Sequence, residues 1–165
     1  MGQVHNECIW GQERTRKEKG FMTGEEKVAA ARLIAKLAHR GQVDKAGNDY
    51  FSHPEAVAAM LDLPEEKIVG YLHDTVEDTE VTIPEIREIF GDRVADAVAL
   101  MTHADGVPYM DYVKEIGKNP LARKVKLADL THNMDLTRIK NPGQKDYDRI
   151  ERKYRPAYTY LKGLG

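Results

Sequence analysis

Cysteine and long apolar runs are both scarce in this sequence. Cys8 is the only cysteine among 165 residues, so an internal disulfide is excluded. No apolar run approaches the roughly 18 residues that cross a bilayer, and we expect no membrane partner. The N-terminal stretch Met1–Asn6 lacks the apolar core of a signal peptide. Together these absences predict a cytoplasmic protein.

An excess of positive charge is also missing. The chain has 25 basic and 27 acidic residues and a net charge of -2, so non-specific nucleic-acid binding is not expected. Hydrophobic residues make up 41% and charged residues 32%, which is typical of a globular rather than a disordered chain. The length suits a single domain.

The N-terminal part differs from the rest. Six charged residues lie between Gly11 and Gly20 without apolar periodicity, so we interpret residues 1–22 as a charged, flexible arm. Residues 23–165 then form the folded domain.

Helical signals dominate from Thr23 onward. Thr23 and Glu26 have the spacing of a capping box, and apolar residues then recur every three or four positions. Glycines and prolines mark the boundaries of the following helices. Helices are predicted to begin near Thr23, Pro54, Pro64, Thr82, Asp92, Pro108, Pro120 and Lys145. Convincing strand alternation is absent, so we predict an all-α domain of seven or eight helices in a compact bundle.

Several polar groups stand where a plain helical core would not place them. They are His53, the pairs His73-Asp74 and Glu77-Asp78, and Asp129. Burying carboxylates together is unfavourable unless a cation compensates them. A set of imidazoles and carboxylates without thiolate suits Mn²⁺, or another divalent ion such as Fe²⁺ or Mg²⁺. Such an ion polarises a phosphoryl oxygen and activates water, which indicates metal-assisted hydrolysis of a phosphate ester or anhydride.

Each of these groups also has an ordinary structural interpretation. A His-Asp pair at a helix end is usually structural, and Glu77-Asp78 alone resembles a solvated helix end. Asp129 alone could pair with Lys126 or Arg123. We assign His132 to packing, because on a helix it points about 100° away from its neighbour Asn133.

Three ordered sequence blocks surround these groups. The first block runs from Ala38-His39-Arg40-Gly41-Gln42 through Lys45-Ala46-Gly47, Tyr50 and His53-Pro54 to Val57-Ala58. The second is residues 73–79, and the third joins Lys126-Leu127-Ala128-Asp129 to His132-Asn133-Met134. Together they resemble the HD-superfamily hydrolase domain of RelA/SpoT-type alarmone enzymes. The resemblance covers about residues 23–162 and implies a stand-alone alarmone hydrolase with the fold of that superfamily.

The resemblance implies a role for each matching residue. The residues that match the family's metal ligands are His53, His73, Asp74 and Asp129, and the family metal is usually Mn²⁺. Glu77 and Asp78 match a pair that positions the attacking water and handles its proton, whereas Lys45 and Asn133 match residues that contact the nucleotide. The implied substrate is a small nucleotide, and the reaction removes 3′-pyrophosphate from ppGpp or pppGpp to leave GDP or GTP.

Two residues depart from the family pattern. Asp44 and Asp135 occupy positions where the family usually carries arginine, and both remove positive charge near the expected substrate. Arg138, one helical turn after Asp135, could compensate. These departures keep one alternative open, a phosphatase for another phosphorylated nucleotide or cofactor. A second alternative is a non-catalytic nucleotide sensor, because domains with this fold can lose catalysis. The sequence assigns no oligomeric state.

Overall fold

The computed structural model describes residues 21–165, and the predicted arm therefore lies outside the described residues except for its last two positions. Within this range the chain forms α-helices joined by turns, and its only β-type pairing is an isolated bridge between Val43 and Asp49. The helices are α1 (Gly24–Ala38), α2 (Ser52–Ala59), α3 (Pro64–Leu72), α4 (Thr75–Asp78), α5 (Ile83–Phe90), α6 (Asp92–Met101), α7 (Tyr109–Gly117), α8 (Pro120–Met134), α9 (Gln144–Arg149) and α10 (Arg155–Gly163). The all-α prediction is confirmed.

The helix boundaries follow the local chemistry of the sequence. Thr23 and Glu26 form the predicted reciprocal capping box at the start of α1, with N···O distances of 2.8 and 3.2 Å. Gly91, at φ 90°, ends α5 in a left-handed conformation that is readily accessible to glycine. One start was misplaced: α2 begins at Ser52, so Pro54 lies inside its first turn.

The predicted C-terminal helix is divided into three segments. A π-helical turn, Ile150–Tyr154, separates α9 from α10. Pro156 lacks a backbone N–H and its ring crowds the carbonyl four residues earlier, which accounts for the widened turn. This interruption and the short α4 explain why the described chain has more helical segments than the seven or eight predicted.

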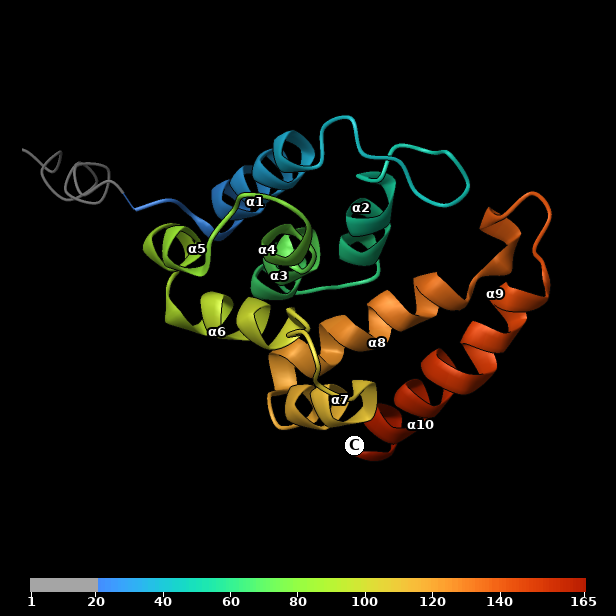
Figure 1. Ribbon diagram of the computed structural model, residues 1–165. Helices are drawn as coiled ribbons and strands as arrows, with labels where there is room; N and C mark the ends of the chain where they lie inside the picture. Colours follow the sequence, from blue (N-terminus) through green and yellow to red (C-terminus); the bar gives the residue numbers. More distant parts are fainter. Residues whose placement is uncertain (1–20) are drawn as a thin grey trace, which may run out of the picture.

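Helices α3 and α8 lie at the centre of the domain. α3 packs against α1, α2, α6 and α8, and α8 also packs against α7 and α10 (Figure 1). Leu72 and Leu130, one from each central helix, are completely buried in the same core cluster. Burial of each such side chain contributes about 1.5–3 kcal/mol to stability. At Gly70, an added Cβ would lie 2.9 Å from a methyl carbon of Leu61, so the glycine permits the close approach of α3 to the end of α2.

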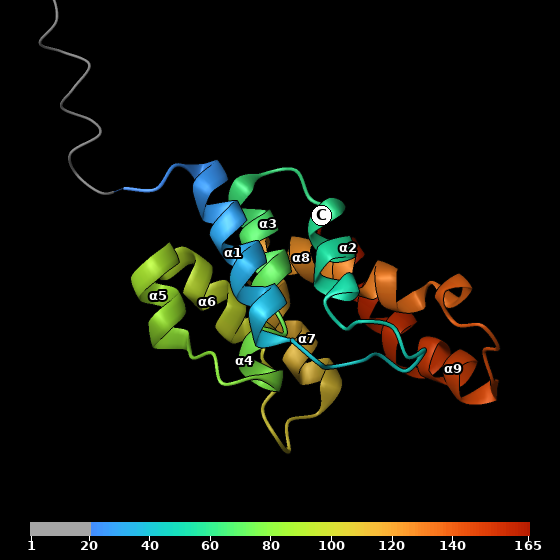
Figure 2. The same ribbon diagram turned by 90° about the horizontal axis from the view of Figure 1, so that it is seen from above.

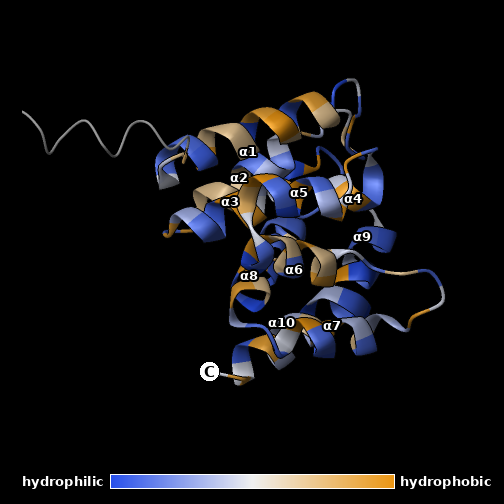
Figure 3. Ribbon diagram, turned by 90° about the vertical axis from the view of Figure 1, so that its left-hand side faces the viewer, coloured by the Kyte–Doolittle hydropathy of each residue, from blue (hydrophilic) through white to orange (hydrophobic). Residues whose placement is uncertain are grey.

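Segments that are far apart in the sequence lie near one another in the fold. Seen from above, the loop between α1 and α2 extends toward α9 (Figure 2). α9 is hydrophilic along most of its length, whereas α1 carries hydrophobic residues on its visible face (Figure 3). On α1, Leu33 and Leu37 are more than half exposed.

None of the helices within residues 21–165 combines the length and apolar character required to cross a membrane.

Candidate active site

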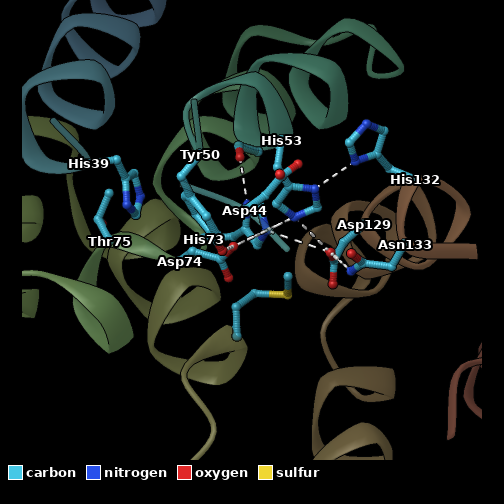
Figure 4. Close-up of polar contacts among 12 residues, drawn as sticks. His39, Asp44, Tyr50, His53, His73, Asp74, Thr75, Asp129, His132 and Asn133 are labelled. Carbon is cyan, nitrogen blue, oxygen red and sulfur yellow. Dashed lines mark hydrogen bonds and ion pairs between the residues drawn. The ribbon is translucent and has the colours of Figure 1, made fainter. Parts of the chain in front are cut away.

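Two histidines and two aspartates meet where α2, the end of α3 and α8 converge. The Nε2 atoms of His53 and His73 are 3.2 Å apart. Asp129 Oδ1 lies 3.1 Å from His53 Nε2, and Asp74 Oδ2 lies 3.2 Å from His73 Nε2 (Figure 4). The potential ligand atoms of His53, His73 and Asp129 all fall within 4.8 Å of one another. The structure thus brings together all four residues that the sequence predicted as metal ligands.

The orientation of His73 leaves one ring nitrogen available to a cation. Its Nδ1–H donates to the carbonyl oxygen of Gly70 at 2.7 Å, and a carbonyl can only accept. Nδ1 therefore carries a proton, and Nε2 is the nitrogen that faces the cluster. Burial opposes a charge on this ring, but Asp74 and Asp129 raise the pKa of His73 well above its usual value, so a bound cation would replace a proton on Nε2. This orientation, and a mixed nitrogen and oxygen donor set, fit a divalent metal ion.

Tyr50 contacts the same carboxylate oxygen of Asp74 that lies near His73. The Tyr50 hydroxyl donates to Asp74 Oδ2 at 2.6 Å. Burial and the negative charge of Asp74 raise the pKa of Tyr50 above its usual value, so it remains a donor. Burial alone would raise the pKa of Asp74, but His73 outweighs it and holds that pKa below its usual value. Asp74 therefore faces the cluster as an ionised carboxylate.

Asp129 has partners for both carboxylate oxygens. Lys126 Nζ lies 2.9 Å from Oδ2, and Asn133 Nδ2 donates to Oδ1 at 2.6 Å. Burial opposes ionisation, yet Lys126 and the hydrogen bonds from His53 and His73 hold the pKa of Asp129 well below its usual value. The ion pair between Asp129 and Lys126 that the sequence suggested is therefore present, and Asp129 also contacts the histidines.

The two acidic residues of α4 differ in their relation to the site. Glu77 lines the pocket described below, whereas Asp78 is absent from its lining. Partial burial and the negative charge of Asp74 raise the pKa of both groups above their usual values. The side chain of Gln42 donates to the backbone carbonyl of Asp78 at 3.0 Å and so secures the end of α4.

A pocket of about 470 Å³ opens over the cluster, within the size range of small-molecule sites. The predicted nucleotide contacts Lys45 and Asn133 both line it. Its cationic lining residues are Lys45, Lys126, Arg138, Arg149 and Lys153. Burial and the nearby charge of Arg149 lower the pKa of Lys45, which is the response expected where cations converge. The pocket can therefore receive an anionic ligand beside the histidine-carboxylate cluster.

The two aspartates that depart from the family pattern are engaged locally. Asp44 Oδ1 accepts hydrogen bonds from the backbone N–H groups of Ala46 and Asn48 at 2.8 and 2.9 Å. Arg138 lies 3.7 Å from its other oxygen and lines the pocket. Asp135 accepts from the backbone N–H of Thr137 at 3.0 Å. The carboxylates of Asp44 and Asp135 thus accept hydrogen bonds from the backbone of their own loops.

Some residues at the site were missed or underrated by sequence reasoning. His132 Nδ1 lies 2.7 Å from His53 Nδ1, which corrects its assignment to packing. The signal was its spacing of three from Asp129, because residues three apart share a helix face. Burial and the neighbouring His53 lower the pKa of His132 to about 4. His39 is fully buried, with Nδ1 bonded to Gln42 at 2.8 Å and Nε2 lacking a hydrogen-bond partner within residues 21–165.

Comparison with known proteins agrees with this geometry. The family model described as "HD domain" matches residues 30–161. A GTP pyrophosphokinase of Streptomyces coelicolor is 38% identical over 120 residues, which are 65% of this chain and 14% of that protein. The bifunctional (p)ppGpp synthase/hydrolase SpoT of Escherichia coli is 32% identical over 148 residues, 79% of this chain and 20% of that protein. The chain thus spans a fifth or less of the length of these relatives.

A solved structure shares the fold. It is described as a metazoan ortholog of SpoT that hydrolyzes ppGpp, and it superimposes with a TM-score of 0.72 at 22% sequence identity. The match covers 88% of this chain and 89% of the other. The arrangement of helices around the cluster is therefore shared with a known protein across nearly the whole domain.

Proposed function

Because the chain belongs to the HD domain family, we propose that it is a metal-dependent phosphohydrolase that removes 3′-pyrophosphate from ppGpp or pppGpp. The observation that carries the proposal is the cluster of His53, His73 and Asp129 at a pocket whose lining includes five lysine and arginine residues as well as carboxylates. The relatives named for (p)ppGpp synthesis or hydrolysis support this choice of substrate. GDP or GTP would be the other product. A cytoplasmic location remains the prediction from the sequence.

The proposed metal ligands are His53, His73, Asp74 and Asp129. Mn²⁺ is the proposed ion, and when bound it would polarise a phosphoryl oxygen and lower the pKa of a water molecule. Both histidines and Asp129 are buried, and His53 and Asp129 also line the pocket through which a substrate would reach the ion. The Tyr50 hydroxyl orients Asp74 toward the histidines.

Glu77 and Asp78 are proposed to serve the attacking water. Glu77 lines the pocket, and its raised pKa suits a carboxylate that takes up a proton during the reaction. Asp78 follows Glu77 in α4, and its charge helps to raise the pKa of Glu77. We therefore assign proton acceptance to Glu77 and a supporting electrostatic role to Asp78.

The remaining walls are proposed to bind the nucleotide. Lys45 from the α1–α2 loop and Arg149 from α9 converge on one side of the pocket, where they would bind phosphate groups. Asn133 lies beside Asp129, close enough to the cluster for contact with a ribose held there. Arg138 adds a cation on the loop side, which offsets the charge of Asp44.

The direct test is hydrolysis of ppGpp by metal-stripped protein to which Mn²⁺ is added back, with nucleotide products separated by anion exchange. We expect Mn²⁺-dependent release of GDP and pyrophosphate. Unchanged ppGpp together with turnover of another phosphorylated nucleotide would favour the alternative phosphatase. Tight ppGpp binding without turnover would favour the sensor.

Replacement of Glu77 by glutamine should separate proton transfer from metal binding. We expect kcat to fall by roughly 10²–10⁴-fold, the usual contribution of a general base, while Mn²⁺ affinity stays unchanged. Because the pKa of Glu77 is raised, activity of the unaltered protein should decline with falling pH above the range in which an ordinary glutamate protonates. Glu77→Gln should abolish that acidic limb.

A neighbouring residue offers a matched control for this variant. Glu80 is exposed and is not among the residues that line the pocket, so Glu80→Gln makes the same chemical change outside the site. Both variants should be compared through pH profiles of kcat. Equal activity of Glu77→Gln and Glu80→Gln across the whole pH range would contradict the assignment of Glu77.

A further inference from the structure

We propose that His132 is a positioning residue that fixes the tautomer of His53, so that the Nε2 lone pair of His53 is available to a cation. The inference rests on the metal site of the proposed function. It assigns a task to a side chain that belongs neither to the proposed ligands nor to the proposed proton acceptors. The supporting contact joins α2, which carries His53, to α8, which carries His132.

The contact between the two rings can hold one proton, on Nδ1 of either His53 or His132. Their Nδ1 atoms are 2.7 Å apart, and the ring centroids are 4.9 Å apart (Figure 4). One Nδ1 must donate and the other must accept for this distance to be a hydrogen bond. If His53 donates, its neutral ring has a free lone pair on Nε2. If His132 donates, a neutral His53 carries its proton on Nε2 and cannot bind a metal ion through that atom.

The two ligand histidines differ in how their tautomers are determined. His73 donates to the carbonyl of Gly70, which can never act as a donor. His53 faces an imidazole, which can donate or accept. Asp129 Oδ1, 3.1 Å from His53 Nε2, favours a proton on that nitrogen in the metal-free protein. A His132 Nδ1 that accepts from His53 Nδ1 shifts the balance toward a free lone pair on Nε2, where a cation would bind.

The backbone of α8 holds His132 in place for this contact. The His132 carbonyl accepts from Arg138 Nη1 at 2.7 Å and from the backbone N–H of Asp135 at 3.2 Å. His132 also lies three residues after Asp129, on the same face of α8. One helix thus supplies a proposed metal ligand and orients another ligand that comes from α2.

The test compares Mn²⁺ affinity, measured by titration calorimetry without nucleotide, in His132→Leu and His132→Asn. Leucine removes the acceptor, and we expect a 10–100-fold loss of affinity, the usual effect of losing an outer hydrogen bond to a metal-ligating histidine. Asparagine can place a carbonyl oxygen near the position of Nδ1, so His132→Asn should recover affinity to within a few-fold of the unaltered protein. Thr131→Ala, which changes an exposed neighbour on α8, is the matched control and should bind Mn²⁺ normally.

A second readout reports the tautomer directly. In the Zn²⁺-loaded protein, nitrogen-15 NMR of the histidine rings should show the His53 proton on Nδ1. Unchanged Mn²⁺ affinity in folded His132→Leu would overturn the proposal, as would equal losses in the leucine and asparagine variants. Since these measurements use no nucleotide, normal metal binding with no ppGpp hydrolysis would contradict the proposed activity and leave the role of His132 standing.

Discussion

Replacement of His73 by alanine should abolish Mn²⁺ binding and ppGpp hydrolysis together. His73 is almost completely buried, and its Nε2 faces both His53 and Asp74. Loss of a direct ligand should cost more than the roughly 10–100-fold that follows loss of an outer contact. We therefore expect Mn²⁺ affinity to fall by more than about 100-fold, with activity at the level of metal-free protein.

The necessary control for this variant separates ligand loss from a cavity in the core. Leu72, adjacent in the sequence and completely buried, can be replaced by alanine in the same way. Leu72→Ala should lower the free energy of unfolding by about 2–5 kcal/mol. It should nevertheless bind Mn²⁺ when folded. If His73→Ala retained full metal content and activity, the assignment of the metal site would be wrong.

The second large effect concerns the buried pair of Lys126 and Asp129. Lys126→Met should lower the free energy of unfolding by about 3–5 kcal/mol, because it leaves a buried carboxylate without its cation. The pair is nearly inaccessible to solvent, and its charged atoms are 2.9 Å apart. Urea denaturation of the metal-free proteins measures this loss.

The double variant Lys126→Met/Asp129→Leu distinguishes an unpaired charge from lost packing. Apolar replacement of a whole buried pair is often neutral or stabilising, so the double variant should recover most of the stability. If it is as unstable as Lys126→Met, lost packing rather than the unpaired carboxylate explains the effect.

The same pair predicts a dependence on pH. The depressed pKa of Asp129 contributes stability that is present above the usual aspartate pKa and is lost as pH falls through the lower folded value. Without Lys126 that pKa rises, and protonation relieves the buried charge earlier. The stability difference between the unaltered protein and Lys126→Met should therefore be largest near neutral pH and should shrink on acidification. A difference independent of pH would contradict the electrostatic origin.

Local chemistry accounts for the parts of the fold that could be predicted. The capping box of Thr23 and Glu26 and the left-handed Gly91 act within one or two turns, so their effects are readable from neighbouring residues. The π-helical turn before Pro156 was missed because a helical spacing of apolar residues does not reveal how the backbone relieves a proline clash. The presence of a helix can therefore be predicted from the sequence more reliably than the backbone geometry inside it.

The sequence by itself determined the helical class, and it singled out His53, His73-Asp74, Glu77-Asp78 and Asp129 because imidazoles and carboxylates are costly to bury without a cation. The resemblance to a known family implied which four of these six residues are metal ligands. Only the tertiary structure decided how they meet. The contact between His53 and His132 spans 79 positions, and the Tyr50–Asp74 hydrogen bond spans 24. Both depend on the packing of α2 and α3 with each other and with α8, and such long-range packing has no signature in the spacing of residues along one helix.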